Sequence, residues 1–140
     1  MTYKEWFITH GNKHRSIMQK LTALSDEEVI AYFRFENMVK KEPDFCLLYA
    51  QNKKCHEVNN LNCYLCACPH FAFDDKGLGQ EGEKTVYSRC GINAKESTTF
   101  ISDKAIHHDC SYCVIPHDEA YIQKHFSRDW FEIMGGDQNV

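Results

Sequence analysis

The stretch Cys63-Tyr-Leu-Cys66-Ala-Cys68-Pro69 decides how the chain is expected to fold, because it places three cysteines within six residues. Two cysteines separated by two residues can turn both sulfurs toward one metal ion, and this spacing recurs in zinc modules. The same spacing returns in Cys110-Ser-Tyr-Cys113, and His117 follows four residues later. The sequence therefore predicts that the middle of the chain folds around bound metal.

The chain carries eight cysteines in 140 residues, and all of them lie between Cys46 and Cys113. Its N-terminus lacks the basic start and apolar stretch of a secretory signal, so we expect a cytoplasmic protein. Cytoplasmic thiols are kept reduced, which favours metal-binding cysteines over disulfides. A thioredoxin-like redox pair is less favoured, because no βαβ pattern surrounds either C-x-x-C pair.

The candidate metal ligands are the eight cysteines and the two histidines closest to them in these motifs: Cys46, Cys55, His56, Cys63, Cys66, Cys68, Cys90, Cys110, Cys113 and His117. Ten such ligands could supply two tetrahedral zinc sites, and the two histidines suit a mixed Cys/His site. Zinc, as two ions, is the favoured interpretation. Taken singly, Cys46 and Cys90 could also be small buried hydrophobic residues.

One 4Fe–4S cluster, with or without zinc, is the alternative. Such clusters also take four cysteines, and Cys68-Pro69 matches the Cys-Pro step that closes the bacterial ferredoxin motif, although the spacing C-x-x-C-x-C is not that of ferredoxins. Residues 67–109 separate the two C-x-x-C pairs, which is more than the roughly 15–20 residues of a zinc ribbon. The cysteine pattern therefore indicates metal but leaves its identity open.

The other six histidines carry a weaker signal. Three are expected to be ordinary surface or helix residues, namely His10, His14 and His125. The role of His70 is left open. For His107 and His108, a position beside the ligands or in solvent is as good an interpretation as a position on the metal.

The cysteine-free ends of the chain have helical patterns. Ser25-Asp-Glu-Glu28 has the form of a capping box, and the apolar spacing after it predicts a helix that ends before Pro43. A shorter helix is expected from Arg15 to Leu24 and a final one over Asp118–Met134.

The middle of the chain has weak periodicity. Thr85–Ser88 and Thr98–Ser102 are expected to be short strands, and the turn-rich residues 74–82 an exposed loop. The sequence thus predicts one domain over residues 1–140, mostly α, with an irregular, metal-stapled middle and at most a few short strands; an α+β fold is the alternative. Its parts are a helical region (1–45), a cysteine-rich segment (46–117), a helix (118–134) and a loose tail (135–140).

In the order of these motifs the chain resembles the cysteine-rich small domain family, a probable metal-binding domain of bacteria and archaea. The matching stretches are Asn62–Pro69, Cys90–Asn93 and Asp109–His117, preceded by Cys55-His56. The resemblance covers roughly Cys46 to His117, and the chain departs from the family's Cys-Gly-Gly-Asn at Ile92. It implies that nine of the candidates form the metal site: Cys55, His56, Cys63, Cys66, Cys68, Cys90, Cys110, Cys113 and His117. Some family members are attached to cobamide-synthesis enzymes, which implies a link to corrinoid metabolism.

Charge and motif content narrow the function. The formal net charge is −4 and becomes more negative when cysteines bind metal as thiolates, which disfavours nucleic acid as a partner. No apolar run approaches the ~18 residues of a membrane span. With no general acid–base pair or nucleotide-binding glycine loop, an enzyme is not favoured.

The sequence predicts a small cytoplasmic zinc-binding protein that serves as a structural, interaction or accessory module for a protein partner. An iron–sulfur redox or accessory protein is the alternative.

Overall fold

The computed structural model describes residues 2–92 and 94–135, which form an α+β fold of 38% helix and 17% strand. The expectation of a mostly α fold is therefore wrong. In chain order the helical elements are α1 (Tyr3–Lys20), α2 (Asp26–Tyr32), α3 (Phe35–Lys41), η1 (Leu47–Gln51), η2 (Ile115–His117), α4 (Glu119–Lys124) and α5 (Trp130–Met134). The strands are β1 (Phe71–Phe73), β2 (Gly79–Glu81), β3 (Lys84–Val86), β4 (Ser88–Cys90), β5 (Thr98–Ile101) and β6 (Ala105–Asp109).

The strands form two sheets. β1 pairs with β4, and the second sheet has the order β2-β3-β6-β5, in which β3 and β6 run parallel. The strand expected at Thr98–Ser102 matches β5, whereas the one at Thr85–Ser88 spans the end of β3 and the start of β4. The loop expected over residues 74–82 contains β2. These strands are three to five residues long, so their sequences hold too little alternation of apolar and polar residues to be recognised as strands. Backbone pairing with neighbouring strands stabilises them instead.

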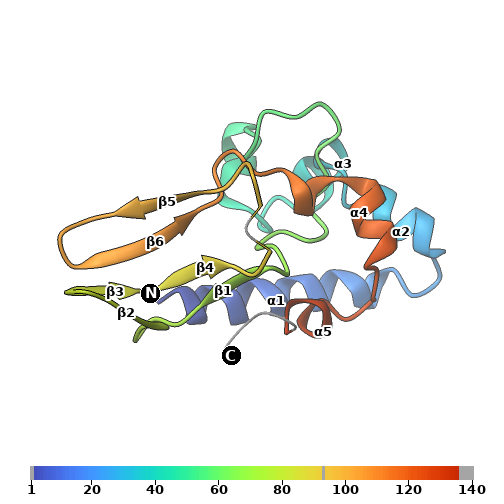
Figure 1. Cartoon of the computed structure of the whole chain (residues 1–140). Coiled ribbons are helices and arrows are strands. Elements are labelled where there is room, and N and C mark those ends of the chain that lie inside the picture. Colours follow the sequence, from blue (N-terminus) through green and yellow to red (C-terminus); the bar gives the residue numbers. More distant parts are fainter. Residues whose placement is uncertain (1, 93, 136–140) are drawn as a thin grey trace.

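Helix α1 packs under β1, as Figure 1 shows along the base of the molecule. It begins with a capping box between Thr2 and Glu5, and the Asp75 carboxylate accepts bonds from its first backbone N–H groups. The helix expected from Arg15 to Leu24 begins twelve residues later than α1 and ends four residues after it. Its N-terminal half packs inward through aromatic and histidine side chains, which a count of aliphatic residues misses.

The capping box at Ser25 is confirmed, but the helix after it is two helices, α2 and α3. The break falls where Arg34 forms an isolated β-bridge with Asn62. The Phe35 N–H donates to the Leu61 carbonyl at 3.0 Å, and the Cys63 N–H donates to the Phe33 carbonyl at 2.8 Å. A non-local strand-like contact thus interrupts the helix and attaches the start of the cysteine motif to the helical core.

The helix expected over Asp118–Met134 is also two helices, α4 and α5. Each has its own aspartate cap, because the Asp118 side chain accepts from the Tyr121 N–H and the Asp129 side chain accepts from the Phe131 N–H. Between them, Arg128 donates to the Leu24 carbonyl and to the Asp26 carboxylate. Of the expected tail over 135–140, residues 136–140 lie outside the described residues.

The core joins α1, the α2–α3 pair and α5 around buried aromatic rings. His10 and His14 lie within it, 3% and 0% exposed, so the expectation that they are ordinary surface or helix residues holds only for their place in a helix. The His14 ring stacks on Phe33 with centroids 4.8 Å apart, and the His10 ring stacks on Trp6 at 4.8 Å. Burial lowers the pKa of His10 to about 4 and that of His14 to about 3. In the described residues no helix is long and apolar enough to cross a membrane.

The buried His14 predicts a pH-dependent stability. Its imidazole stays neutral in the folded chain down to a pKa of about 3 but takes a proton near pH 6.5 in the unfolded chain. The unfolded chain therefore holds more protons between these values, and the free energy of unfolding falls as the pH drops from 6.5 toward 3. We expect His14→Leu to flatten this fall in urea unfolding followed by circular dichroism between pH 7 and pH 5.

The exposed His125→Leu is the matched control, and its pH profile should parallel that of the parent chain. Metal-linked protonation acts on all three chains, so the difference between their profiles reports the substituted histidine. Equal pH slopes in the parent chain and His14→Leu would contradict the prediction.

Candidate metal centre

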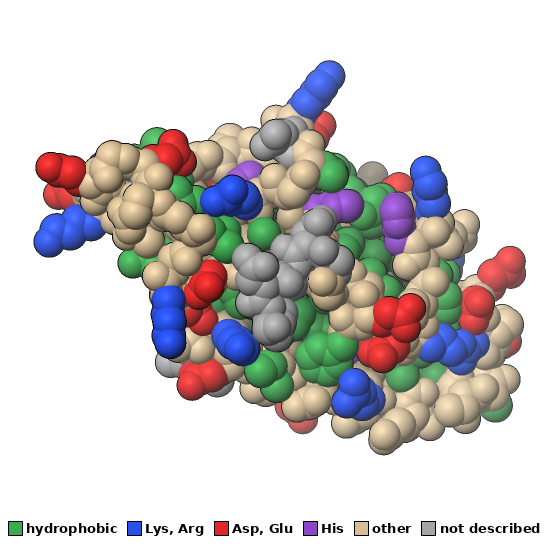
Figure 2. Space-filling view, turned by 60° about the horizontal axis from the view of Figure 1, so that its bottom comes forward, with side chains coloured by type: hydrophobic (Ala, Val, Ile, Leu, Met, Phe, Trp, Pro, Cys, Tyr) green, Lys and Arg blue, Asp and Glu red, His purple; other side chains and the backbone are tan. Residues whose placement is uncertain are grey.

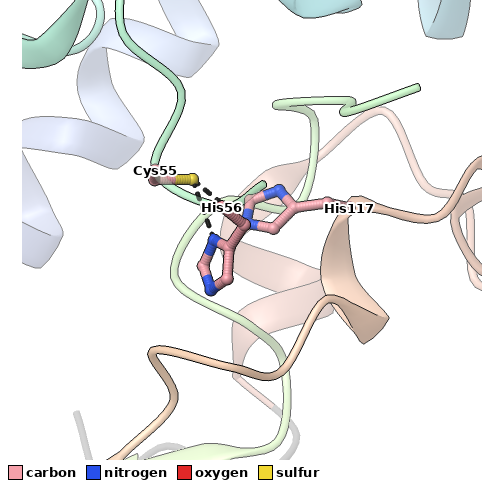
Figure 3. Close-up of side chains that lie close together, drawn as sticks. All are labelled: Cys55, His56 and His117. Atoms are coloured by element: carbon pink, nitrogen blue, oxygen red, sulfur yellow. Dashed lines mark hydrogen bonds between the residues drawn. The ribbon is translucent and has the colours of Figure 1, made fainter. Parts of the chain in front are cut away.

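Cys55, His56 and His117 bring three metal-ligating side chains together. Their ligand atoms all lie within 4.8 Å of one another, and they make the one such group of three or more Cys, His, Asp or Glu residues in the part of the chain that the structure describes. The Cys55 Sγ lies 3.1 Å from His56 Nδ1 and 3.5 Å from His117 Nε2. Figure 3 shows the sulfur pointing at both imidazole rings, which come from separate segments of the chain.

The far side of each imidazole faces a backbone carbonyl. His56 Nε2 lies 3.0 Å from the Cys110 carbonyl oxygen, and His117 Nδ1 lies 2.9 Å from the Asn62 carbonyl oxygen. A carbonyl oxygen only accepts, so each of these nitrogens carries the proton of the neutral ring. The lone pairs of the other two nitrogens therefore face the Cys55 sulfur, as they do in histidines that ligate metals.

The separations also fit a single small ion. With Zn–S near 2.3 Å and Zn–N near 2.0–2.1 Å, tetrahedral geometry places sulfur and nitrogen about 3.6 Å apart. The two sulfur–nitrogen distances of 3.1 and 3.5 Å lie close to this value. Burial lowers the pKa of His117 to about 4, so this ring is neutral and able to bind metal at neutral pH.

Asn62 fixes His117 to the core. Besides accepting from the imidazole, the Asn62 backbone N–H donates to the His117 carbonyl at 3.2 Å. Its side-chain amide donates to the Ile30 carbonyl at 2.8 Å and to the Glu119 carboxylate at 3.1 Å, and its side-chain oxygen accepts from the Tyr64 N–H at 2.9 Å. Asn62 is fully buried, and its bonds to Ile30, Tyr64 and the His117 ring are shielded from water, whereas the bond to Glu119 is part-buried.

The other cysteines surround this trio in two sets. The first set comprises Cys46, Cys63 and Cys66, and the second comprises Cys68, Cys90, Cys110 and Cys113. Burial is the main effect that raises the pKa of Cys63 to about 12, and thiolate charge on Cys55 and Cys46 raises it further. Burial also raises the pKa of Cys66, and charge on Cys55, Cys63 and Cys46 raises it further.

The second set is coupled in the same way. Burial raises the pKa of Cys110 to about 12, and thiolate charge on Cys68, Cys113 and Cys90 adds to the effect. For Cys68 burial again comes first, raising its pKa to about 11, and Cys113 and Cys90 contribute. Each set therefore lies near enough for its charges to interact, although none of its sulfurs belongs to the close trio.

A turn between the two sets separates Cys66 from Cys68. Ala67 and Cys68 both have positive φ, 94° and 63°, which residues other than glycine rarely adopt. The turn is held by bonds from the Cys66 N–H to the Cys63 carbonyl and from the Cys68 N–H to the Leu65 carbonyl. The three-cysteine motif thus supplies both sets through one strained turn.

A cavity of about 300 Å³ lies between these groups. It is lined by the trio, by Cys66 of the first set, by all four cysteines of the second set, and by His70 and His108. Its remaining wall includes the aromatic side chains of Tyr3, Trp6 and Phe71. Figure 2 shows histidine side chains beside hydrophobic surface on one face, where Lys and Arg are interspersed with Asp and Glu.

The structure thus brings three of the ten predicted ligands into direct contact and places the other seven around them. All eight cysteines are described, and none is in a disulfide. Among the histidines left open by the sequence, His70 and His108 line the cavity, while His107 is exposed and stacks on Tyr87. Sequence reasoning missed the aromatic wall, because residues of α1 carry no metal-binding signal and their apolar spacing indicates only a buried face.

Comparison with known proteins adds no relative: no protein-family model, curated protein or solved structure matches the chain. The resemblance to the cysteine-rich small domain family therefore rests on the quoted motifs alone.

The contacts of Asn62 predict a large effect of its replacement by aspartate. Asn62→Asp removes both amide donors and sets a carboxylate against the Ile30 carbonyl and the Glu119 carboxylate. We expect a loss of about 3 kcal/mol or more in the free energy of unfolding, measured by urea titration with circular dichroism.

Asn37→Asp is the matched control, since Asn37 makes one half-buried bond to the Ala31 carbonyl. Its expected loss is about 1 kcal/mol. Similar losses in the two variants would show that Asn62 does not have the central role assigned to it.

Proposed function

We propose that the protein is a cytoplasmic zinc-binding module, in which zinc held by Cys55, His56 and His117 joins the two ends of the cysteine-rich segment, the loop at Cys55 and the turn at His117. The observation that carries this proposal is the convergence of three ligand atoms within 4.8 Å, with both imidazoles oriented by backbone carbonyls. The protein partner predicted from the sequence stays a prediction.

The chemistry of the surrounding thiols supports a structural role for metal. Burial raises the pKa of Cys63 and of Cys110 to about 12, so these thiols are protonated at neutral pH when no cation is present. A divalent ion displaces those protons and compensates the buried thiolate charge. It also orders segments rich in turns, whose chain entropy few apolar contacts offset.

The second set gives the iron–sulfur alternative its support. Cys68, Cys90, Cys110 and Cys113 form an all-cysteine group, which is the usual ligand set of iron–sulfur clusters and also serves zinc. The second candidate function is therefore that of a redox or accessory protein, with an iron–sulfur cluster on this set and zinc at the trio.

The proposal predicts the metal content of protein prepared without oxygen. We expect two zinc ions per chain in the parent protein and one in His117→Asn, because loss of the buried imidazole removes one of three ligands at one site. Zinc, iron and acid-labile sulfide are measured on the same sample by elemental analysis and colorimetry.

His107→Asn is the matched control, since His107 is an exposed histidine on β6, and it should retain both ions. Zinc in the parent chain that is unaffected by His117→Asn would refute the trio as a site. Iron and sulfide in a coloured sample, with zinc reduced to one ion, would favour the second candidate.

A further inference from the structure

Strand β5 forms an open edge of the larger sheet. It is the last strand in the order β2-β3-β6-β5, and in the part of the chain that the structure describes no strand pairs with its outer side. All four of its residues are exposed, and two of them are large and apolar, Phe100 at 62% and Ile101 at 60% exposed. Figure 1 shows the β5–β6 hairpin projecting from the body of the molecule.

This edge lacks the features that usually prevent strands of different molecules from pairing. Natural sheets block such pairing with charged side chains, with proline or with a bulge in the edge strand. The strand Thr98-Thr-Phe-Ile101 has no charged residue and no proline, and its register with β6 is continuous. The opposite edge strand, β2, is polar, because it consists of glycine, glutamine and glutamate. Of the two edges of this sheet, β5 is therefore the one suited to pairing.

The hairpin geometry determines which backbone groups of β5 point outward. The Ser102 N–H donates to the Ala105 carbonyl at 2.9 Å, at the closed end of the hairpin. Along an antiparallel strand, residues that bond to the neighbouring strand alternate with residues whose backbone groups point away from it. Phe100, two residues before Ser102, therefore also bonds toward β6, whereas the N–H and carbonyl groups of Thr99 and Ile101 point outward.

A second copy of the same strand satisfies these outward groups. When two β5 strands run antiparallel with Phe100 at the twofold axis, Thr99 of each chain lies opposite Ile101 of the other. Each of these pairs exchanges both of its backbone hydrogen bonds, so every outward N–H and carbonyl of the two residues gains a partner. The two Phe100 side chains then lie opposite one another on one face of the sheet, where aromatic pairs are stabilising.

The charges at the two ends of β5 favour this self-pairing. Lys95 and Glu96 lie just before the strand, Asp103 and Lys104 lie just after it, and all four residues are exposed. An antiparallel pair brings the start of each strand beside the end of the other. Glu96 then lies next to Lys104 of the second copy, and Lys95 next to its Asp103. Each junction matches acids with bases, and this complementarity argues for a second copy of the chain as the occupant of the edge.

We propose that β5 is a dimerisation edge, at which two chains pair β5 with β5, antiparallel about Phe100, and join their larger sheets into one continuous sheet. The contact uses the same edge on both chains, so it closes at two copies and leaves the polar β2 strands at the ends. The inference goes beyond the proposed function and requires no metal at the trio. Because the interface is small, we expect reversible association with a dissociation constant of about 10–100 µM.

The test is sedimentation equilibrium of the full chain, kept reduced without oxygen, at about 5–500 µM protein. The mass should rise with concentration from one chain and level off at two. Thr99→Pro removes an outward N–H and leaves the bonds between β5 and β6 in place, so it should weaken the dimer about tenfold or more. Thr99→Ala keeps that N–H, is the matched control and should dimerise as the parent chain does. Circular dichroism verifies that both variants are folded.

A charge exchange tests the same contact without altering the strand. Glu96→Lys and Lys104→Glu each set like charges against one another at both junctions, so each should weaken the dimer about fivefold at low salt. The two changes combined restore opposite charges and should return the dissociation constant to that of the parent chain. These variants test the proposal even where Thr99→Pro does not fold.

A parent chain that stays monomeric up to the highest concentration would overturn the proposal, and so would a dimer that folded Thr99→Pro leaves unchanged. A mass that continues to rise beyond two chains would contradict the closed pair. Failure of the combined charge variant to recover the affinity that each single change loses would contradict the antiparallel arrangement.

Discussion

The bond between the His117 imidazole and the Asn62 backbone carbonyl attaches the candidate metal centre to the helical core. Asn62 lies where the cysteine motif meets the break between α2 and α3, and its side chain also bonds to Ile30 and Glu119. The helical core therefore determines where His117 lies and which of its nitrogens is free. Without this bond, Cys55 and His56 would face a ring of undefined orientation, and the trio would lose its geometry.

Local signals in the sequence were sufficient where local contacts determine the structure. The capping box at Ser25 begins a helix because its bonds join residues three apart. The two longest expected helices were wrong in their continuity, for different reasons. A bridge from Asn62 interrupts the first, which no local pattern contains. The second has an aspartate cap inside it at Asp129, a signal that was present in the sequence and was outweighed by the apolar spacing around it.

The candidate site was predictable in composition but not in arrangement. Residue type and spacing place Cys55, His56 and His117 among ten candidate ligands, yet they give no reason to separate these three from the rest. That separation depends on the carbonyls of Cys110 and Asn62 and on the left-handed turn at Ala67 and Cys68. The turn uses no glycine, so the residue pattern gave no indication of it. The fold class depends equally on non-local contacts, since β3 and β6 pair in parallel although β4 and β5 lie between them in the chain.

The trio is asymmetric, because Cys55 is exposed whereas His117 is 5% exposed. Bound metal would therefore leave by opening of the loop that carries Cys55, while the imidazole stays fixed in the core. Exchange of the ion with cellular chelators would then depend on the motion of this short surface segment and not on global unfolding. The rate at which a bound ion leaves would thus depend on this loop, and a change in the loop could alter that rate while the helical core stays as it is.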